Sequence, residues 1–353
     1  MSTTLAWQGT TGGVPLQCVE IPRREPRRDD ITVRIDFCGV CHSDLHALQG
    51  ATPHMSDSGG LVPGHEFTGT VVSVGSAVTR FAAGDGVAVG TLVDSCGECA
   101  MCVVGQENFC HLGPLSTYGG TDPVDGSVTK GGYSREYVLR EKFAYHLPEA
   151  LDPAAAAPLM CAGVTMWEPL RALGVGPGSR VAIAGLGGLG HLGVKLAAAL
   201  GAEVTVLSRT AGKAEDALAL GAEGLLLTTD EDQVRRARGR FDLVLDTVSA
   251  DHALSPLLGV LALDGTLCVV GNPLMTGPRL LELTSGRKRL TSSGTGGTKG
   301  TAEMLAFCAR HGITADAEVL PSSRVTEALN RLGSGDVRYR FVLDLSDLDQ
   351  KNA

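Results

Sequence analysis

The sequence predicts an α/β protein in which a mostly-β domain is joined to a domain built on a doubly wound parallel sheet. Three observations lead to this prediction. The chain has 353 residues, which suits about two domains of ordinary size. Its first 150 residues contain short runs that alternate apolar and polar side chains. From residue 180 onward, strand-like and helix-like segments follow one another.

The expected strands of the first part lie between glycine and aspartate turn signals. Residues 31–35 alternate apolar and polar positions, as a half-buried strand does, and 70–74 and 86–89 are further candidates. The alanine-rich segment 152–158 predicts a helix and marks the change to the second part.

The second part alternates in a way that favours βαβ units and a parallel sheet. Its predicted strands are 180–184, 203–208, 242–246 and 265–270. Helices are predicted to begin near Leu189, Lys213 and His252. The chain then returns to a mixed pattern and ends in a strand-like run at 339–343.

Composition excludes several classes of protein. Hydrophobic residues make up 43% and charged residues 20%, so a large core is expected. No apolar run approaches the roughly 20 residues of a membrane span, and the N-terminus lacks the pattern of a secretory signal. We therefore expect a cytoplasmic protein without a membrane partner. The net charge of -9, without blocks of like charge, argues against nucleic acid as a partner.

Four of the ten cysteines fall within one short segment. Cys96, Cys99, Cys102 and Cys110 form a CxxCxxC-x7-C pattern. Four thiolates at this spacing can complete a tetrahedral Zn²⁺ site with no open position, so we expect a structural zinc. Four small core residues or two disulfides are the alternatives. A DNA-binding zinc ribbon is disfavoured because residues 93–110 contain no Lys or Arg.

A second, open metal site is predicted from scattered residues. Cys41, His65 and Cys161 together supply a Cys-His-Cys set, which leaves the fourth position of a zinc ion free. Cys38 competes with Cys41 for the ligand role. Glu66 could be an occasional fourth ligand or could support the other ligands. Asp44 could accept the free N–H of His65, or could be a turn or cap acid.

Ser43 and His46, which follow Cys41 in the chain, suit a proton relay. Because this pair follows Cys41 at useful offsets, we prefer Cys41 to Cys38 as the metal ligand. Ser43 supplies a hydroxyl that can take the proton of an oxygen bound at the metal. His46 can pass that proton to water, because the pKa of histidine lies near neutrality.

A glycine-rich turn stands between a predicted strand and a predicted helix. The turn consists of Gly185, Leu186, Gly187, Gly188, Leu189 and Gly190. A GxGxxG pattern in this setting permits a tight turn and lets a pyrophosphate approach a helix N-terminus. A glycine-rich packing turn is the alternative. The motif therefore predicts a dinucleotide site.

The end of the next strand indicates which dinucleotide is bound. NAD-binding chains place an acidic residue there for the ribose 2′-hydroxyl. Here the stretch contains Ser208, Arg209 and Thr210, with Lys213 close by and no carboxylate. These side chains suit a 2′-phosphate, so NADP(H) is predicted, although Arg209 and Lys213 could also be ordinary solvated charges.

Taken together, these features resemble the medium-chain zinc-dependent alcohol dehydrogenases, and among them the cinnamyl-alcohol-dehydrogenase-like branch with its NADPH-dependent aldehyde reductases. The motifs that carry the resemblance are CGVCHSDLH (38–46), PGHE (63–66), the four-cysteine segment, GGYS (131–134), CAGVT (161–165), GLGGLGH (185–191), DTVSA (246–250), EMLAFCARHGI (303–313) and GDVRYRFVLD (335–344).

The resemblance implies a fold, cofactors and site residues. It implies a GroES-like catalytic domain over 1–155 and 299–353, a Rossmann domain over 156–298, and a homodimer. It implies two zinc ions per subunit, with Cys41, His65, Cys161 and the adjoining Glu66 at the catalytic one. Ser43 and His46 would form the relay. The further cofactor contacts expected are Thr165, Thr247, Gly271 and Ser293.

The expected activity is hydride transfer between NADP(H) and a primary alcohol or aldehyde. One rival is a reductase of the same fold that acts on a C=N or C=C bond. A rival from another class is a non-catalytic zinc- and nucleotide-binding protein, which should show a broken ligand set.

Overall fold

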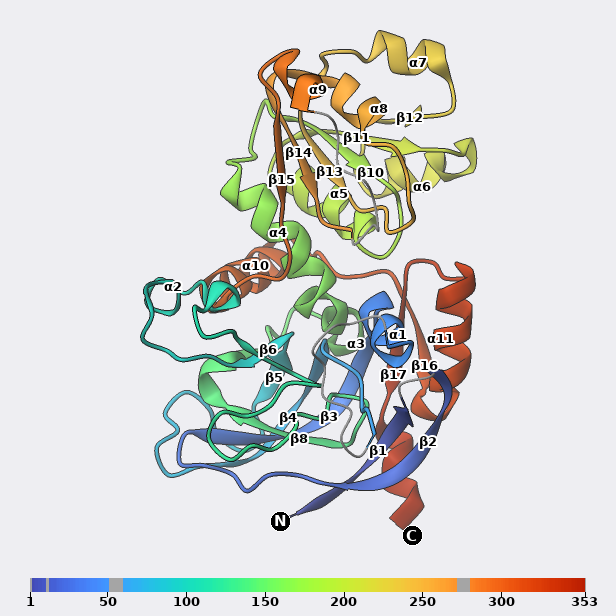
Figure 1. Cartoon of the computed structure of the whole chain (residues 1–353). Helices are drawn as coiled ribbons and strands as arrows, with labels where there is room; N and C mark the ends of the chain where they lie inside the picture. Colours follow the sequence, from blue (N-terminus) through green and yellow to red (C-terminus); the bar gives the residue numbers. More distant parts are fainter. Residues whose placement is uncertain (1, 11–12, 51–59, 272–279, 353) are drawn as a thin grey trace. The chain divides into compact units, whose positions relative to one another are not determined.

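The chain forms two compact units in the computed structural model, which describes residues 2–10, 13–50, 60–271 and 280–352 (Figure 1). The first unit comprises 1–161 and 296–353, and the second comprises 162–295. Residues 156–161 and 296–298, which the sequence analysis assigned to the second domain, therefore belong to the first unit. The reason is local: Cys161 lies beside Cys41 and His65, and Thr298 is held by Glu107.

The second unit is built on a six-stranded sheet in which every neighbouring pair is parallel. Its spatial order is β12 (Gly224–Leu227), β11 (Glu203–Ser208), β10 (Arg180–Ala184), β13 (Phe241–Asp246), β14 (Leu261–Val269) and β15 (Arg289–Ser292). In chain order this is 3-2-1-4-5-6, the strand order of the doubly wound dinucleotide-binding fold. The helices are α4 (Ala162–Ala172), α5 (Gly190–Ala199), α6 (Ala214–Ala219), α7 (Glu231–Arg236), α8 (Ser255–Gly259) and α9 (Leu280–Thr284).

The predicted strands and helices of this unit are present, although the strand expected at 265–270 begins at Leu261 and the one expected at 242–246 begins at Phe241. The strands at 180–184 and 203–208 have the predicted bounds. Strands β12 and β15 were not predicted: β12 has only four residues, and all four residues of β15 are exposed, so neither shows a burial alternation. The helix expected near His252 begins only at Ser255, because Pro256 favours the first turn of a helix and His252 is bound elsewhere.

The first unit is mostly β, as predicted. Its main sheet runs β16 (Ala317–Pro321), β17 (Arg340–Asp344), β3 (Asp30–Val40), β4 (Phe67–Val74), β5 (Gly86–Val89) and β9 (Ala144–His146), with β8 (Glu136–Arg140) paired to β3. Two small sheets join β1 (Thr3–Thr10) to β2 (Gly13–Pro22) and β6 (Leu92–Asp94) to β7 (Leu115–Ser116). The helices are α1 (His42–Leu48), α2 (Ala100–Val103), α3 (Pro153–Ala156), α10 (Thr298–His311) and α11 (Val325–Ser334).

Both ends of the chain contribute to this sheet. Strand β17, from the C-terminal part, pairs antiparallel with β3, so that Phe341 lies opposite Val40 and Leu343 opposite Cys38. The predicted helix of the alanine-rich segment is present as α3, where the Asp152 side chain accepts the Ala155 N–H and Pro153 occupies the first turn.

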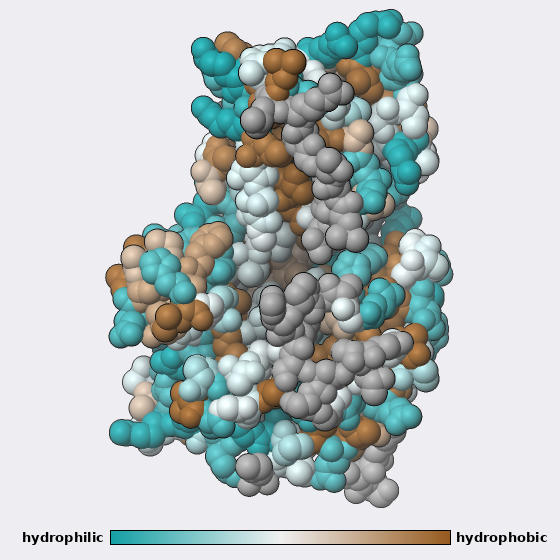
Figure 2. Space-filling model, viewed as in Figure 1, coloured by the Kyte–Doolittle hydropathy of each residue, from teal (hydrophilic) through white to brown (hydrophobic). Residues whose placement is uncertain are grey.

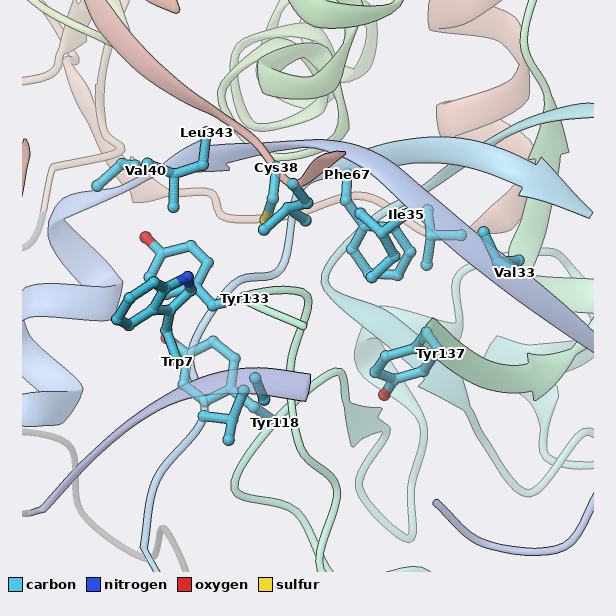
Figure 3. Close-up of a cluster of buried hydrophobic side chains, with 14 of the residues drawn as sticks. Trp7, Val33, Ile35, Cys38, Val40, Phe67, Tyr118, Tyr133, Tyr137 and Leu343 are labelled. Carbon is cyan, nitrogen blue, oxygen red and sulfur yellow. The ribbon is translucent and has the colours of Figure 1, made fainter. Parts of the chain in front are cut away.

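The core of the first unit is a cluster of buried side chains to which β3 and β4 contribute (Figure 3). Phe67, Tyr133 and Ile35 are fully buried there. Burying a large apolar side chain contributes roughly 1.5–3 kcal/mol. This packing stabilises β3 and β4; Cys41 directly follows β3, and His65 lies shortly before β4. In the part of the chain that the structure describes, no helix has the length and apolar character needed to cross a membrane.

Candidate active site and metal centres

Cys41, His65 and Cys161 converge in the first unit, although they come from distant parts of the chain. Their ligand atoms all lie within 4.8 Å of one another. Cys41 Sγ is 4.0 Å from Cys161 Sγ, and His65 Nε2 is 3.2 Å from Cys161 Sγ. Tetrahedral zinc bonds imply roughly 3.8 Å between two sulfurs and about 3.6 Å between sulfur and nitrogen. The three side chains therefore fit a zinc ion and leave one coordination position to a substrate.

Local structure aims these ligands. Cys41 is the N-cap of α1, immediately after β3 ends at Val40. Gly64, just before His65, has a φ of +98°, and a Cβ there would lie 2.7 Å from the backbone nitrogen of Tyr133. Only glycine allows this turn and this close approach. Cys38, the competing candidate, is fully buried in the core and is not part of the cluster.

Asp44 performs both of the roles considered for it. One carboxylate oxygen accepts the Cys41 backbone N–H at 2.9 Å, which caps α1. The other lies 3.0 Å from His65 Nδ1 and accepts the Gly64 N–H at 3.0 Å. A proton on Nδ1 leaves Nε2 free to bind metal. Burial by itself lowers the pKa of His65, but the Asp44 charge raises it well above its usual value.

Two tyrosines complete the surroundings of Asp44, and no role had been predicted for them. The Tyr133 hydroxyl donates to Asp44 at 3.0 Å, and the Tyr118 ring lies next to His65, with 5.7 Å between the ring centroids. Burial, reinforced by the Asp44 charge, raises the pKa of both tyrosines well above the usual value, so both remain donors. Tyr133 belongs to the GGYS motif, which was the available signal. Both rings belong to the buried cluster drawn in Figure 3.

Glu66 is fully buried and bound by an arginine. Its two carboxylate oxygens lie 2.9 and 2.6 Å from Arg340 Nη2, and Arg340 is itself buried. Glu66 is not in the cluster of ligand atoms around Cys41. The structure thus shows Glu66 paired with Arg340, and both roles considered for it, as an occasional fourth ligand and as support for the other ligands, remain predictions. Arg340 lies in the GDVRYRFVLD motif, but its partner could not be identified from the sequence.

The predicted relay residues lie next to this centre on α1. Ser43 is exposed, and its Oγ is 3.7 Å from Cys41 Sγ. His46 is half-buried one turn further on, so Ser43 and His46 share a face of the helix. This arrangement places a hydroxyl at the metal site and an imidazole beyond it.

The contact between the two ligand thiols separates their pKa values: it raises the pKa of Cys161 well above the usual value of a thiol, and burial adds to the rise. The contact with Cys161 lowers the pKa of Cys41 well below the usual value of a thiol. The charges of Arg340 and His65 act in the same direction and outweigh the effect of burial. The thiolate is the form of cysteine that binds metal.

The other four cysteines form a second cluster, as the spacing predicted. Cys96 Sγ is 3.8 Å and Cys99 Sγ is 3.5 Å from Cys102 Sγ, and Cys110 completes the set. All four are free thiols, so the disulfide alternative does not describe this structure. Gly97, between the first two, adopts a φ of +78° in the tight turn. The donor set fits a structural zinc with no open position.

The segment 96–112, here called the zinc lobe, has little apolar packing of its own. Val103, Phe109 and Leu112 are 71%, 59% and 81% exposed, and the lobe is visible as a brown and tan group at the left of Figure 2. Its link to the rest of the unit is polar. The buried Glu107 accepts the Thr298 N–H at 2.8 Å and thereby caps α10.

In the second unit, the glycine turn follows β10 as predicted. Gly185 has a φ of +88°, and a Cβ there would lie 2.9 Å from Thr247 Oγ1. Helix α5 begins at Gly190. Thr247 follows β13, Gly271 follows β14 and Ser293 follows β15, so these residues stand at the carboxyl ends of parallel strands. In this fold, ligands bind at that edge.

The residues predicted to bind the 2′-phosphate lie at the end of β11. Ser208 is the last residue of the strand, and Arg209 and Thr210 are exposed. Lys213 Nζ donates to the Leu186 carbonyl at 2.9 Å, so this cation is engaged with the glycine turn. Among the predicted cofactor residues of the second unit, Thr165 is buried in α4, and its contact with the cofactor remains a prediction.

The chain is similar to known proteins in both sequence and structure. Residues 27–149 match the family model described as an alcohol dehydrogenase GroES-like domain, and 188–310 match the model of a zinc-binding dehydrogenase. An NADP-dependent alcohol dehydrogenase C from Mycobacterium bovis is 45% identical over 351 residues, which is 99% of this chain and 100% of the relative.

Two solved structures are similar over nearly the whole chain. A cinnamyl alcohol dehydrogenase from Sorghum bicolor superposes with a TM-score of 0.93 at 40% identity, covering 97% of this chain and 98% of its own. The protein abbreviated CAD from Helicobacter pylori, solved in complex with NADP(H), superposes with a TM-score of 0.90 at 30% identity and the same coverage.

Proposed function

Because the chain belongs to the medium-chain zinc-dependent alcohol dehydrogenases, we propose that it transfers hydride between NADP(H) and a primary alcohol or aldehyde. The observation that carries this proposal is the three-ligand set of Cys41, His65 and Cys161, which fits a zinc ion with one position open. Because all three metal ligands are present, the alternative of a non-catalytic zinc- and nucleotide-binding protein is disfavoured.

The two cofactors supply the chemistry that amino acids lack. Zinc held by these three ligands would act as a Lewis acid toward the substrate oxygen, and NADP(H) would give or take the hydride. Two zinc ions per subunit are implied, since Cys96, Cys99, Cys102 and Cys110 form a second complete set.

The side chains of this protein position the groups and move the proton. Asp44 holds His65 in the orientation that points Nε2 at the metal. In the reductive direction, the Ser43 hydroxyl gives its proton to the developing alkoxide and recovers one through His46. The glycine turn and the exposed Arg209 are the proposed sites of the pyrophosphate and of the 2′-phosphate.

The activity itself is tested by following NADPH consumption with benzaldehyde or cinnamaldehyde, with and without a chelator. We expect turnover that the chelator abolishes and added zinc restores. Turnover that resists full removal of the metal would contradict the proposal. A cyclic imine in the same panel tests the C=N alternative.

Removing the Ser43 hydroxyl should slow turnover without weakening cofactor binding. We expect Ser43→Ala to lower kcat about 10²-fold, the ordinary contribution of a positioned proton-transfer group. Ser43→Thr is the matched control, because it keeps a hydroxyl at the same place. Steady-state kinetics and NADPH titration check this; an Ala variant as fast as the Thr variant would remove Ser43 from the relay.

Arg209 should decide the preference for NADPH over NADH. Hydrogen bonds to a charged group are worth about 1.5–3 kcal/mol, so Arg209→Gln should raise the KM for NADPH roughly tenfold or more. The KM for NADH should stay unchanged, because NADH has no 2′-phosphate. Arg238→Gln, at another exposed arginine of the same unit, is the control. A parallel rise in both KM values would show that Arg209 does not contact the 2′-phosphate.

A homodimer and a cytoplasmic location remain predictions. An open sheet edge supports the first, since all four residues of β15 are exposed at the end of the parallel sheet. Sedimentation would distinguish one 36.5 kDa subunit from two.

A further inference from the structure

A buried carboxylate stands at the carboxyl end of the central strand β13. Asp246 is the last residue of that strand and is fully buried. Burial raises its pKa, while the Val248 N–H and His252 counteract the rise. Its Oδ1 accepts the Val248 N–H at 3.1 Å, and its Oδ2 lies 2.9 Å from His252 Nε2. A buried carboxylate that loses such a partner is costly, so this contact is expected to order the chain around it.

His252 contacts two acceptors of its own segment. Its Nδ1 lies 2.8 Å from the Ala250 carbonyl oxygen, and its Nε2 lies 2.9 Å from the Asp246 carboxylate. The imidazole therefore joins two points of the same short segment, and it ties residues 247–251 into a closed loop.

This loop packs against the glycine turn. Thr247 donates its backbone N–H to the Ala184 carbonyl at 3.0 Å and its hydroxyl to the same oxygen at 2.8 Å. A Cβ at Gly185 would lie 3.1 Å from Val248 Cγ2, and one at Gly271 would lie 2.4 Å from the Val248 carbonyl oxygen. The loop is thus confined between two glycines at the ligand-binding edge of the sheet.

We propose that His252 is a positioning residue for NADP(H): by binding Asp246, it holds Thr247 and Val248 against Gly185 and keeps the glycine turn in the shape that receives the pyrophosphate. This inference rests on the proposed function, because the ligand is its cofactor. The benefit is preorganisation, since a turn already held in shape loses less conformational freedom on binding. Nothing in this role requires His252 to touch the dinucleotide.

The test replaces His252 with either of two amide side chains, glutamine or asparagine, which differ in length. In His252→Gln, the amide nitrogen takes the place of Nε2 and can still donate to Asp246. In His252→Asn, the amide reaches only as far as Nδ1 and can bind the Ala250 carbonyl but not the carboxylate. His146→Asn, at an exposed histidine of the first unit whose Nε2 lies 2.9 Å from the Arg80 carbonyl, is the control for general effects.

The Kd for NADPH is measured by fluorescence titration and the Kd for adenosine 2′-monophosphate by calorimetry. We expect His252→Asn to weaken NADPH binding about tenfold, the equivalent of 1.4 kcal/mol, and His252→Gln to bind within twofold of the wild type. Adenosine 2′-monophosphate lacks the pyrophosphate, so its Kd should be the same in all variants. The kcat at saturating NADPH should also change little.

The outcomes separate this inference from the proposed function. If the wild type binds and uses NADPH but His252→Asn binds it equally well, the role of His252 is overturned and the function stands. If both nucleotides weaken together, the variant has damaged the unit as a whole, which also contradicts a positioning role. If the wild type does not bind NADPH, the function fails and this inference fails with it.

Discussion

Replacing Cys41 or His65 with alanine is expected to lower kcat/KM for an aldehyde by at least about 10³-fold, because the Lewis acid that stabilises the developing charge contributes several kcal/mol. The rest of the molecule should be unaffected, since the Cys96–Cys110 cluster and the glycine turn are formed by other residues. Steady-state kinetics, NADPH titration and thermal unfolding together check this expectation.

Cys18→Ala is the matched control for Cys41→Ala. Cys18 is a half-buried free thiol on β2 and belongs to neither cluster, so its removal should leave turnover and metal content unchanged. Retention of wild-type turnover by a Cys41→Ala protein that has lost its metal would rule out the proposed chemistry.

Replacing Cys110 with serine is expected to lower the stability of the protein but not the rate of aldehyde reduction. The zinc lobe leaves Val103, Phe109 and Leu112 exposed, so a metal ion and not an apolar core is expected to hold it together. Loss of a structural metal is among the few causes of very large destabilisation, and we expect the free energy of unfolding to fall by roughly 4 kcal/mol. Part of this loss comes from the cap that Glu107 provides to α10.

Urea unfolding with metal analysis checks the prediction for the lobe. Leu112→Ser, in the same lobe and 81% exposed, should change the unfolding midpoint little. The folded fraction of the Cys110→Ser protein should still reduce aldehydes, since the Cys41 centre is intact. A variant that lost one zinc per subunit and unfolded like the wild type would show that the lobe needs no metal.

Local pattern was sufficient to predict much of the fold. The strands of the parallel sheet were recognisable because β10 and β11 are almost continuously buried between short turns. The short strand β12 and the exposed strand β15 carry no such pattern. The helix expected near His252 begins three residues later, at Ser255, because a contact with Asp246 holds His252 in a loop.

The metal ligands could be predicted for a different reason. Cys41 and His65 each lie in a short motif of chemically distinctive residues and were identifiable before their proximity was known, whereas Cys161 stands alone and was assigned because it completes the ligand set. Their supporting partners were not identifiable, because these are remote in sequence: Tyr133 is 89 residues from Asp44, and Arg340 is 274 residues from Glu66. The residues next to a tyrosine or an arginine in the sequence do not indicate which carboxylate its side chain will bind.

Elemental analysis of the purified protein tests the central claim most directly, because an open catalytic zinc beside a closed structural zinc requires two metal ions in every subunit. We predict two zinc ions per subunit in the wild type and one in Cys41→Ala. One zinc per wild-type subunit, in protein that reduces aldehydes at full rate, would contradict the account.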